Sequence, residues 1–169
     1  MILTGYTQRI EQDLTPEQII APVYADSGDP ALLAAHCLAA IDPHLAEVSR
    51  EGDVLVVNGR LHTGAQAEIA VIALQALGFA AVICAEAADS IVALAGVYGL
   101  PILIQATAAT ALSARQIVRI DLERGAIEER ETSLVWRSAP CPPEVIAATR
   151  RNQMLLRMRR VVEDEGFAE

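Results

Sequence analysis

The residues most suited to chemistry lie together in the stretch NGRLHTGAQAE, at positions 58–68. Arg60 could bind a carboxylate through its planar guanidinium. His62 could exchange a proton, because the pKa of imidazole lies near neutrality. Thr63 and Gly64 come directly before a segment with helical spacing, and the free N–H groups and positive dipole end of a helix N-terminus favour anions. The stretch therefore predicts a site for a small anion.

The same residues also have a purely structural interpretation. Residues 63–66 match a helix capping box, in which the Thr63 hydroxyl accepts a hydrogen bond from the first turn and the Gln66 side chain reaches back to the cap N–H. Glu68 would then stabilise the first turn through the helix dipole. A lone histidine is more often a surface or hydrogen-bonded residue than a catalytic one. Both interpretations stay open at the level of the sequence.

Other kinds of site are disfavoured by the residues that are missing. The glycines at 59 and 64 have the spacing of a phosphate-binding loop, but Ala65 and Gln66 stand where Lys and Ser or Thr must contact phosphate and metal. The dinucleotide-binding pattern G-x-G-x-x-G follows none of the expected strands. The three cysteines, at 37, 84 and 141, are odd in number and far apart, so we expect buried thiols and no metal site.

Composition limits the class of protein. The 169 residues suffice for one domain with a real core. Apolar residues make up 53% but aromatic residues only 4%, which suits aliphatic helices packed on a parallel sheet. The net charge of −9 argues against a nucleic-acid partner. The longest apolar stretch is interrupted and too short for a membrane span, and the N-terminus does not read as a signal peptide, so we expect a cytoplasmic protein.

The elements that must position these residues follow from hydrophobic periodicity. Alternation of strands and helices through the first hundred residues predicts parallel strands with right-handed crossovers. Period-two segments then predict antiparallel strands, and Pro142-Pro143 predicts an amphipathic terminal helix with a solvated charged face. Strands are expected at 2–10, 54–57, 81–84, 100–104, 117–122, 126–131 and 132–137, and helices at 30–41, 65–77, 87–97 and from about 142.

Three stretches resemble a known family. They are TPEQIIAPVY near the N-terminus, GDVLVVNGRLHTGAQAEIAVIALQALGFAAVI around the candidate site, and EAADSIVALAGVYGLPIL beyond it. These are similar to the D-T-D-Q-I-I-P, G-x-G-S-S-R-E and G-L-P-I segments of the small subunit of isopropylmalate dehydratase, the swivel domain of the aconitase superfamily. The resemblance covers most of the chain from 5 to 103 and implies an α/β fold: a single swivelling β/β/α domain over 1–169, with a helical tail from about 142.

The resemblance also implies a function. Such a chain would be the small subunit of a hydro-lyase of the leucine-biosynthesis type, acting on a small hydroxy-carboxylic acid. Its partner would be a larger subunit carrying a 4Fe-4S cluster that binds the departing hydroxyl, and this chain itself would hold no cofactor or metal. Substrate contacts would come from Arg60 and from the loop residues Thr63, Gly64, Ala67 and Glu68.

The departures from the family pattern fall where its chemistry would be. Gly64 and Glu68 are retained, but the paired serines that supply the base are replaced by Ala65 and Gln66, and the carboxylate-binding arginine by Ala67. None of these replacements can take a proton or bind a carboxylate bidentately. A substitute base could come from the histidine at 62. Two hypotheses remain: a subunit with altered or reduced catalysis, or a non-catalytic paralogue that binds a ligand or regulates a large-subunit partner.

Overall fold

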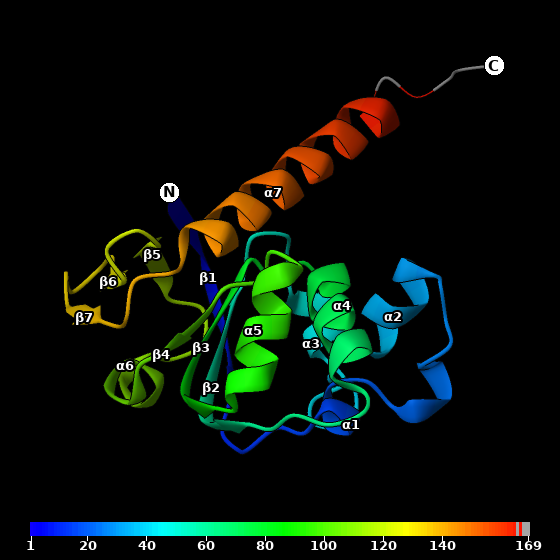
Figure 1. Ribbon diagram of the computed structural model, residues 1–169, viewed down its shortest axis with the longest axis horizontal. Coiled ribbons are helices and arrows are strands. Elements are labelled where there is room, and N and C mark those ends of the chain that lie inside the picture. Colours follow the sequence, from blue (N-terminus) through cyan, green and yellow to red (C-terminus); the bar gives the residue numbers. More distant parts are fainter. Residues whose placement is uncertain (165, 167–169) are drawn as a thin grey trace.

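The seven strands form one mixed sheet. A computed structural model describes residues 1–164 and residue 166, and within them the strand order is β4-β3-β2-β1-β5-β6-β7 (Figure 1). The neighbours from β1 to β4 run parallel, whereas β5, β6 and β7 continue the sheet antiparallel from β1. The predicted parallel core with flanking antiparallel strands is therefore confirmed. The strands are β1 Ile2–Ile10, β2 Val54–Leu61, β3 Ala81–Ala87, β4 Ile102–Ile104, β5 Ile117–Asp121, β6 Ala126–Glu129 and β7 Val135–Arg137.

Helices cover both faces of the parallel strands. On one face α1 to α5 enclose the larger apolar core, and on the other α6 and the start of α7 enclose a second core with β5 and β6 (Figure 1). The short helices α1 and α6 were not expected from the sequence. The helices are α1 Pro16–Ile19, the 3₁₀ helix η1 Pro22–Tyr24, α2 Pro30–His36, α3 Leu45–Val48, α4 Ala67–Leu77, α5 Asp89–Val97, α6 Ala106–Ala111 and α7 Pro143–Asp164.

The prediction of a helix over 30–41 is wrong beyond His36. Cys37 has extended backbone, and Leu38 has a positive φ of 59°, so the chain leaves the helix here. Both side chains are fully buried. The apolar residues that suggested a longer helix are therefore used to cover the core from a turn, because burial outweighs the local helix preference.

The central strand β2 is packed from both sides. Leu55 and Val57 enter the core beneath α4, while Val54 and Val56 enter the opposite core. A strand whose residues are buried on both faces is read from sequence as a continuous apolar run, as it is here. This packing fixes where β2 ends, and hence where the polar residues that follow it lie.

Strand β2 is longer than predicted. The sequence indicated an end at Val57, but pairing resumes with Arg60 opposite Glu86 after a shift of register. The irregularity admits Asn58 and Gly59 into the strand, as a β-bulge does. A Cβ on Gly59 would lie 2.6 Å from the carbonyl of Gln12, so only glycine allows the segment after β1 to cross so closely.

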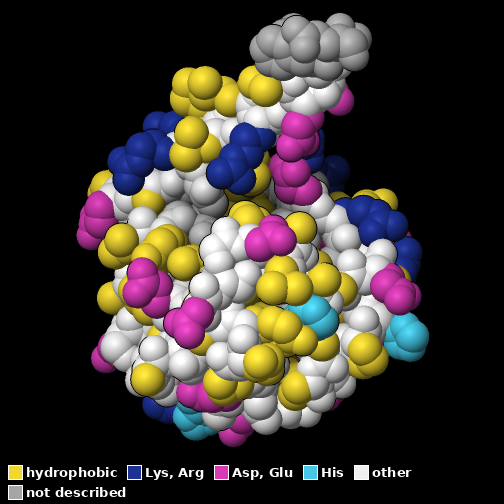
Figure 2. Space-filling view, turned by 90° about the vertical axis from the view of Figure 1, so that its right-hand side faces the viewer, with side chains coloured by type: hydrophobic (Ala, Val, Ile, Leu, Met, Phe, Trp, Pro, Cys, Tyr) yellow, Lys and Arg dark blue, Asp and Glu magenta, His cyan; other side chains and the backbone are white. Residues whose placement is uncertain are grey.

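Helix α7 extends away from the sheet at the upper side of the molecule (Figure 1). The amphipathic prediction gave it a solvated charged face, but the structure exposes an apolar stripe as well. Arginines and hydrophobic side chains gather along this upper part (Figure 2). Within the described residues, no helix is both long and apolar enough to cross a membrane. The exposed stripe consists of Met154, Leu155, Met158, Val161 and Val162.

Candidate functional site

The carboxyl edge of the parallel strands collects acidic side chains around Arg60 and His62. The Arg60 N–H donates to Asp13 Oδ1 at 2.8 Å, and Arg60 Nη1 lies 3.0 Å from Glu86 Oε2. His62 Nε2 lies 3.8 Å from Asp13 Oδ2. Sequence reasoning singled out Arg60 and His62 but missed Asp13 and Glu86. Their signal was available: Asp13 follows the first strand and Glu86 lies near the end of β3, and parallel pairing brings such positions to the same edge.

The backbone keeps His62 beside Asp13. The N–H of Leu14 donates to the Arg60 carbonyl at 2.9 Å, and the His62 N–H donates to the Leu14 carbonyl at 2.8 Å. The imidazole is 43% exposed, so it can reach both solvent and a bound molecule. The arrangement therefore places an imidazole nitrogen, which can exchange a proton, at the open edge beside a carboxylate.

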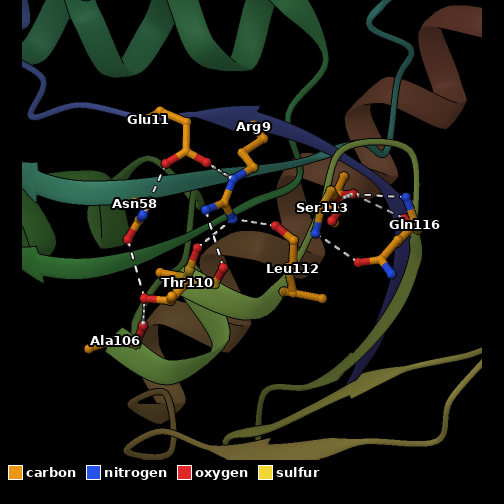
Figure 3. A network of polar contacts seen from close by, with 10 residues as sticks. Arg9, Glu11, Asn58, Ala106, Thr110, Leu112, Ser113 and Gln116 are labelled. Atoms are coloured by element: carbon orange, nitrogen blue, oxygen red, sulfur yellow. Dashed lines mark hydrogen bonds and ion pairs between the residues drawn. The ribbon is translucent and has the colours of Figure 1, made fainter.

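A second polar network braces the edge next to β1. The Arg9 guanidinium donates to carbonyls at the end of α6, including that of Ala109 at 2.6 Å, and pairs with the Glu11 carboxylate (Figure 3). Asn58 Nδ2 donates to the other Glu11 oxygen at 3.0 Å. Hydrogen bonds from Arg9, and then from Asn58, lower the pKa of Glu11. Because Arg9 is fully engaged, it serves as a structural brace and leaves Arg60 as the guanidinium at the site.

The predicted capping box at Thr63–Gln66 is wrong. Helix α4 begins at Ala67, and its N-cap Gln66 makes no side-chain cap bond. The capping box lies at α1 instead, where Thr15 and Gln18 bond reciprocally, at 3.3 Å and 2.9 Å. The same four-residue spacing occurs in both places, but only the α1 segment has proline at the first helical position, which favours a helix start there.

The side-chain carbonyl of Gln66 is unusual because it is buried without a hydrogen bond from any described residue. Its Oε1 atom is buried, and within the described residues it has no hydrogen-bond partner. Thr63, Gly64 and Ala65 are exposed. The N–H of Ala67 donates a hydrogen bond to the Gly64 carbonyl at 3.1 Å. A buried carbonyl oxygen without a donor is costly, so the loop is not fully satisfied in the isolated chain.

Neither Glu68 nor Ala67 joins the cluster of charged side chains around Arg60. The Glu68 carboxylate accepts a hydrogen bond from the Tyr98 hydroxyl at the end of α5. This bond raises the pKa of Tyr98 above its ordinary value of 10.0. Ala67 is buried and has no polar side-chain atom. The structure therefore brings Arg60 and His62 together with two carboxylates, while it directs Glu68 towards a neighbouring helix.

The three thiols offer no cluster site. Cys37, Cys84 and Cys141 are buried and free, and they are split between the two apolar cores. Burial raises the pKa of Cys84 to about 12, which disfavours the thiolate that binds metal. In the part of the chain that the structure describes, no three His, Cys, Asp or Glu side chains are grouped to hold a metal ion. These residues do not fit an iron-sulfur cluster.

The fold and the site define an α/β domain whose polar edge, at the carboxyl ends of its parallel strands, lies open to solvent. The sequence is similar over most of its length to those of named enzyme subunits. It is 33% identical to the 3-isopropylmalate dehydratase small subunit of Moorella thermoacetica, over 88% of this chain and 91% of that one. It is 30% identical to small subunit 1 of the Methanopyrus kandleri enzyme, with 83% of each chain covered.

A solved structure gives the same result. The crystal structure of 3-isopropylmalate dehydratase from Methanocaldococcus jannaschii superposes with a TM-score of 0.77 and 29% identity, covering 98% of this chain and 99% of that one. No protein-family model matches the sequence. The chain belongs to the family of 3-isopropylmalate dehydratase small subunits. The resemblance found from three sequence stretches is thus confirmed, and with it the swivel-domain fold.

Proposed function

We propose that this chain is the small subunit of a hydro-lyase of the isopropylmalate dehydratase type, active in the cytoplasm on a small hydroxy-carboxylic acid. The observation that carries the proposal is the 33% identity to a 3-isopropylmalate dehydratase small subunit over 88% of the chain. We further infer that the chain folds as one domain, with α7 as its helical tail. A larger subunit would cover the open carboxyl edge and complete the site.

The iron-sulfur cluster implied by the family is assigned to that larger subunit. This assignment is supported by the buried, separated thiols of this chain. When bound, such a cluster supplies a Lewis acid for the hydroxyl that leaves. The present chain would contribute the groups that hold the carboxylate and move the proton.

Within this proposal His62 takes the place of the missing serine base. It would accept the proton from the carbon next to the substrate carboxylate, with Asp13 Oδ2 lying 3.8 Å from its Nε2. Arg60 would bind the substrate carboxylate, which would either replace Glu86 as its ion-pair partner or bind beside it. The exposed residues Thr63 and Gly64 would form the rim of the site, and the N-terminus of α4 would favour the anion.

A second function is supported by the loop itself. Ala65, Gln66 and Ala67 provide neither a base nor a carboxylate clamp. The chain could then bind a large subunit without turnover and act as a ligand-binding or regulatory paralogue. This alternative differs from the first in one measurable property, the turnover of the assembled complex.

The test is to assay the chain with a compatible large subunit on 2- and 3-isopropylmalate. We expect turnover that His62→Gln lowers by roughly 100- to 10,000-fold, the usual contribution of a general base. Arg60→Gln should mainly raise KM. The matched control is His44→Gln, because His44 is an exposed histidine paired with Glu47 on α3.

Two outcomes would redirect the assignment. Turnover that survives His62→Gln would remove His62 as the base. A complex that forms but shows no turnover would support the regulatory paralogue. In that case the triple variant Ala65→Ser, Gln66→Ser and Ala67→Arg, which restores base and clamp, should gain activity if this loop alone has diverged.

A further inference from the structure

A polar cavity lies at the end of the parallel strands opposite the candidate site. Asp53 directly precedes β2, whereas Arg60 lies near its end, seven residues further on. At the usual rise along a strand the two positions are roughly 20 Å apart. The cavity has a volume of about 260 Å³ and is lined by Tyr6, Gln8, Val48, Arg50, Asp53 and Arg115. Its position makes it independent of the proposed dehydratase site.

A buried carboxylate forms part of this cavity wall. Asp53 is only 3% exposed, and its Oδ2 atom accepts hydrogen bonds from Gln8 Nε2 and from the Arg50 N–H, each at 2.9 Å. Among the described residues these hydrogen bonds go to Oδ2, and Oδ1 is not one of the buried side-chain atoms left without a partner, so it is open to the cavity and its solvent. Oδ1 can therefore accept a hydrogen bond from a bound molecule in place of water.

A strained turn carries an arginine to the same cavity. Arg115 has a positive φ of 66°, a conformation that residues other than glycine rarely adopt. Thr7 holds the turn, because its carbonyl accepts a hydrogen bond from the Arg115 N–H at 2.7 Å. The Thr7 hydroxyl donates to the Ser113 carbonyl and accepts from the Gln116 N–H; Ser113 and Gln116 are labelled in Figure 3.

The two arginines of the cavity differ in how far they are engaged. Among the residues that the structure describes, the Arg115 guanidinium has no hydrogen bond or ion pair. The Arg50 guanidinium uses Nη1 for the Glu47 and Ser49 carbonyls, at 2.8 and 3.1 Å. Its other nitrogens remain for a ligand. The cavity thus combines two cationic groups with one carboxylate oxygen that is open to it.

We propose that this cavity binds a small α-amino acid. The ligand carboxylate lies between Arg115 and Arg50, and its ammonium group donates to Asp53 Oδ1. The apolar wall at Val48 receives a small aliphatic side chain. The volume is slightly below the range of ordinary ligand pockets, which limits the ligand to a few heavy atoms beyond the zwitterion.

Isothermal titration of the full chain with L-valine tests the proposal. We expect binding with a Kd of roughly 10 µM to 1 mM. Two analogues each lack one charge: 2-hydroxy-3-methylbutanoate replaces the ammonium by a hydroxyl, and isobutylamine lacks the carboxylate. Each should bind at least about tenfold more weakly, because charge-assisted hydrogen bonds are about twice as strong as neutral ones.

Variants then locate the binding. Arg115→Gln changes an exposed side chain, so the fold should persist and the affinity for L-valine should fall at least about tenfold. Asp53→Asn should weaken L-valine more than the hydroxy acid. The control Arg124→Gln, at an exposed arginine on the β5–β6 turn, should leave the Kd unchanged.

The results that would overturn the proposal are definite. Absence of L-valine binding at concentrations up to about 50 mM would do so. Equal affinity for the hydroxy acid would remove the ammonium contact with Asp53. An unchanged Kd in Arg115→Gln would place any binding elsewhere on the chain. Because the titration needs no large subunit, these results do not depend on the dehydratase proposal.

Discussion

Replacing Gly59 by alanine is expected to destabilise the protein, whereas replacing Gly64 by alanine is not. The two glycines flank the same candidate site and look alike in the sequence. A Cβ on Gly59 would lie 2.6 Å from the carbon and oxygen of the Gln12 carbonyl and 2.8 Å from the Asp13 nitrogen. A Cβ on Gly64 would find its nearest atom, Glu17 Oε1, at an ordinary 3.6 Å.

The magnitude follows from which atoms must move. The contacts at Gly59 are backbone atoms, so the crossing segment has to shift, and such overpacking costs about 1–3 kcal/mol. The shift would also strain the 2.8 Å hydrogen bond from the Arg60 N–H to Asp13, worth about 1 kcal/mol. A total of about 3 kcal/mol corresponds to a Tm lowered by about 6–12 °C for a domain of this size.

Thermal and urea unfolding of both variants provide the assay. We expect Gly59→Ala to lower the free energy of unfolding by about 3 kcal/mol and Gly64→Ala to stay within about 0.5 kcal/mol of the parent. Gly28→Ala is a further control, because nothing lies within 4 Å of a Cβ there. The reasoning fails if Gly59→Ala is as stable as the parent, or if Gly64→Ala loses as much stability as Gly59→Ala.

Three further outcomes can be measured on the purified chain. In Glu68→Gln the pKa of Tyr98, followed by NMR titration, should fall towards 10.0; in the parent the stability that this bond contributes is present at neutral pH and is lost as pH rises through the raised pKa of Tyr98. Arg9→Lys should lower the free energy of unfolding by about 1–2 kcal/mol in urea titrations, because one ammonium cannot serve the several carbonyls at the end of α6. Native protein should react slowly with a thiol reagent at pH 8 and unfolded protein rapidly, since burial holds the pKa of Cys84 near 12; fast native labelling of all three thiols would contradict this.

Much of the fold was predictable because burial leaves a local pattern. The strand Ile2–Ile10 was predicted with the bounds that the structure has, and helix α4 was predicted within two residues of its start. Continuous runs such as Val54–Val57 indicate strands covered on both faces, and the structure buries them completely. The short helix α6 was missed because six residues of Ala and Thr show no clear periodicity.

The candidate site was predictable only in part. Arg60 and His62 were chosen by residue type, and both lie at the carboxyl edge of the parallel strands. The capping box was misplaced because Thr63–Gln66 and Thr15–Gln18 share one spacing, and the choice between them depends on how the chain enters each helix. The extension of β2 past Val57 was missed because Asn-Gly usually indicates a turn.

The sequence by itself determined the class of fold, the family and the absence of the family's base and clamp at Ala65, Gln66 and Ala67. Those features depend on residue identity and on short-range periodicity, which the linear chain contains. Only the tertiary structure decided which charged groups meet. Asp13 reaches His62, and Arg115 reaches the cavity beside Asp53, across 49 and 62 positions of the chain. Such encounters are set by strand order and register, because parallel pairing of β1 with β2 and antiparallel pairing of β1 with β5 bring distant segments to one edge of the sheet.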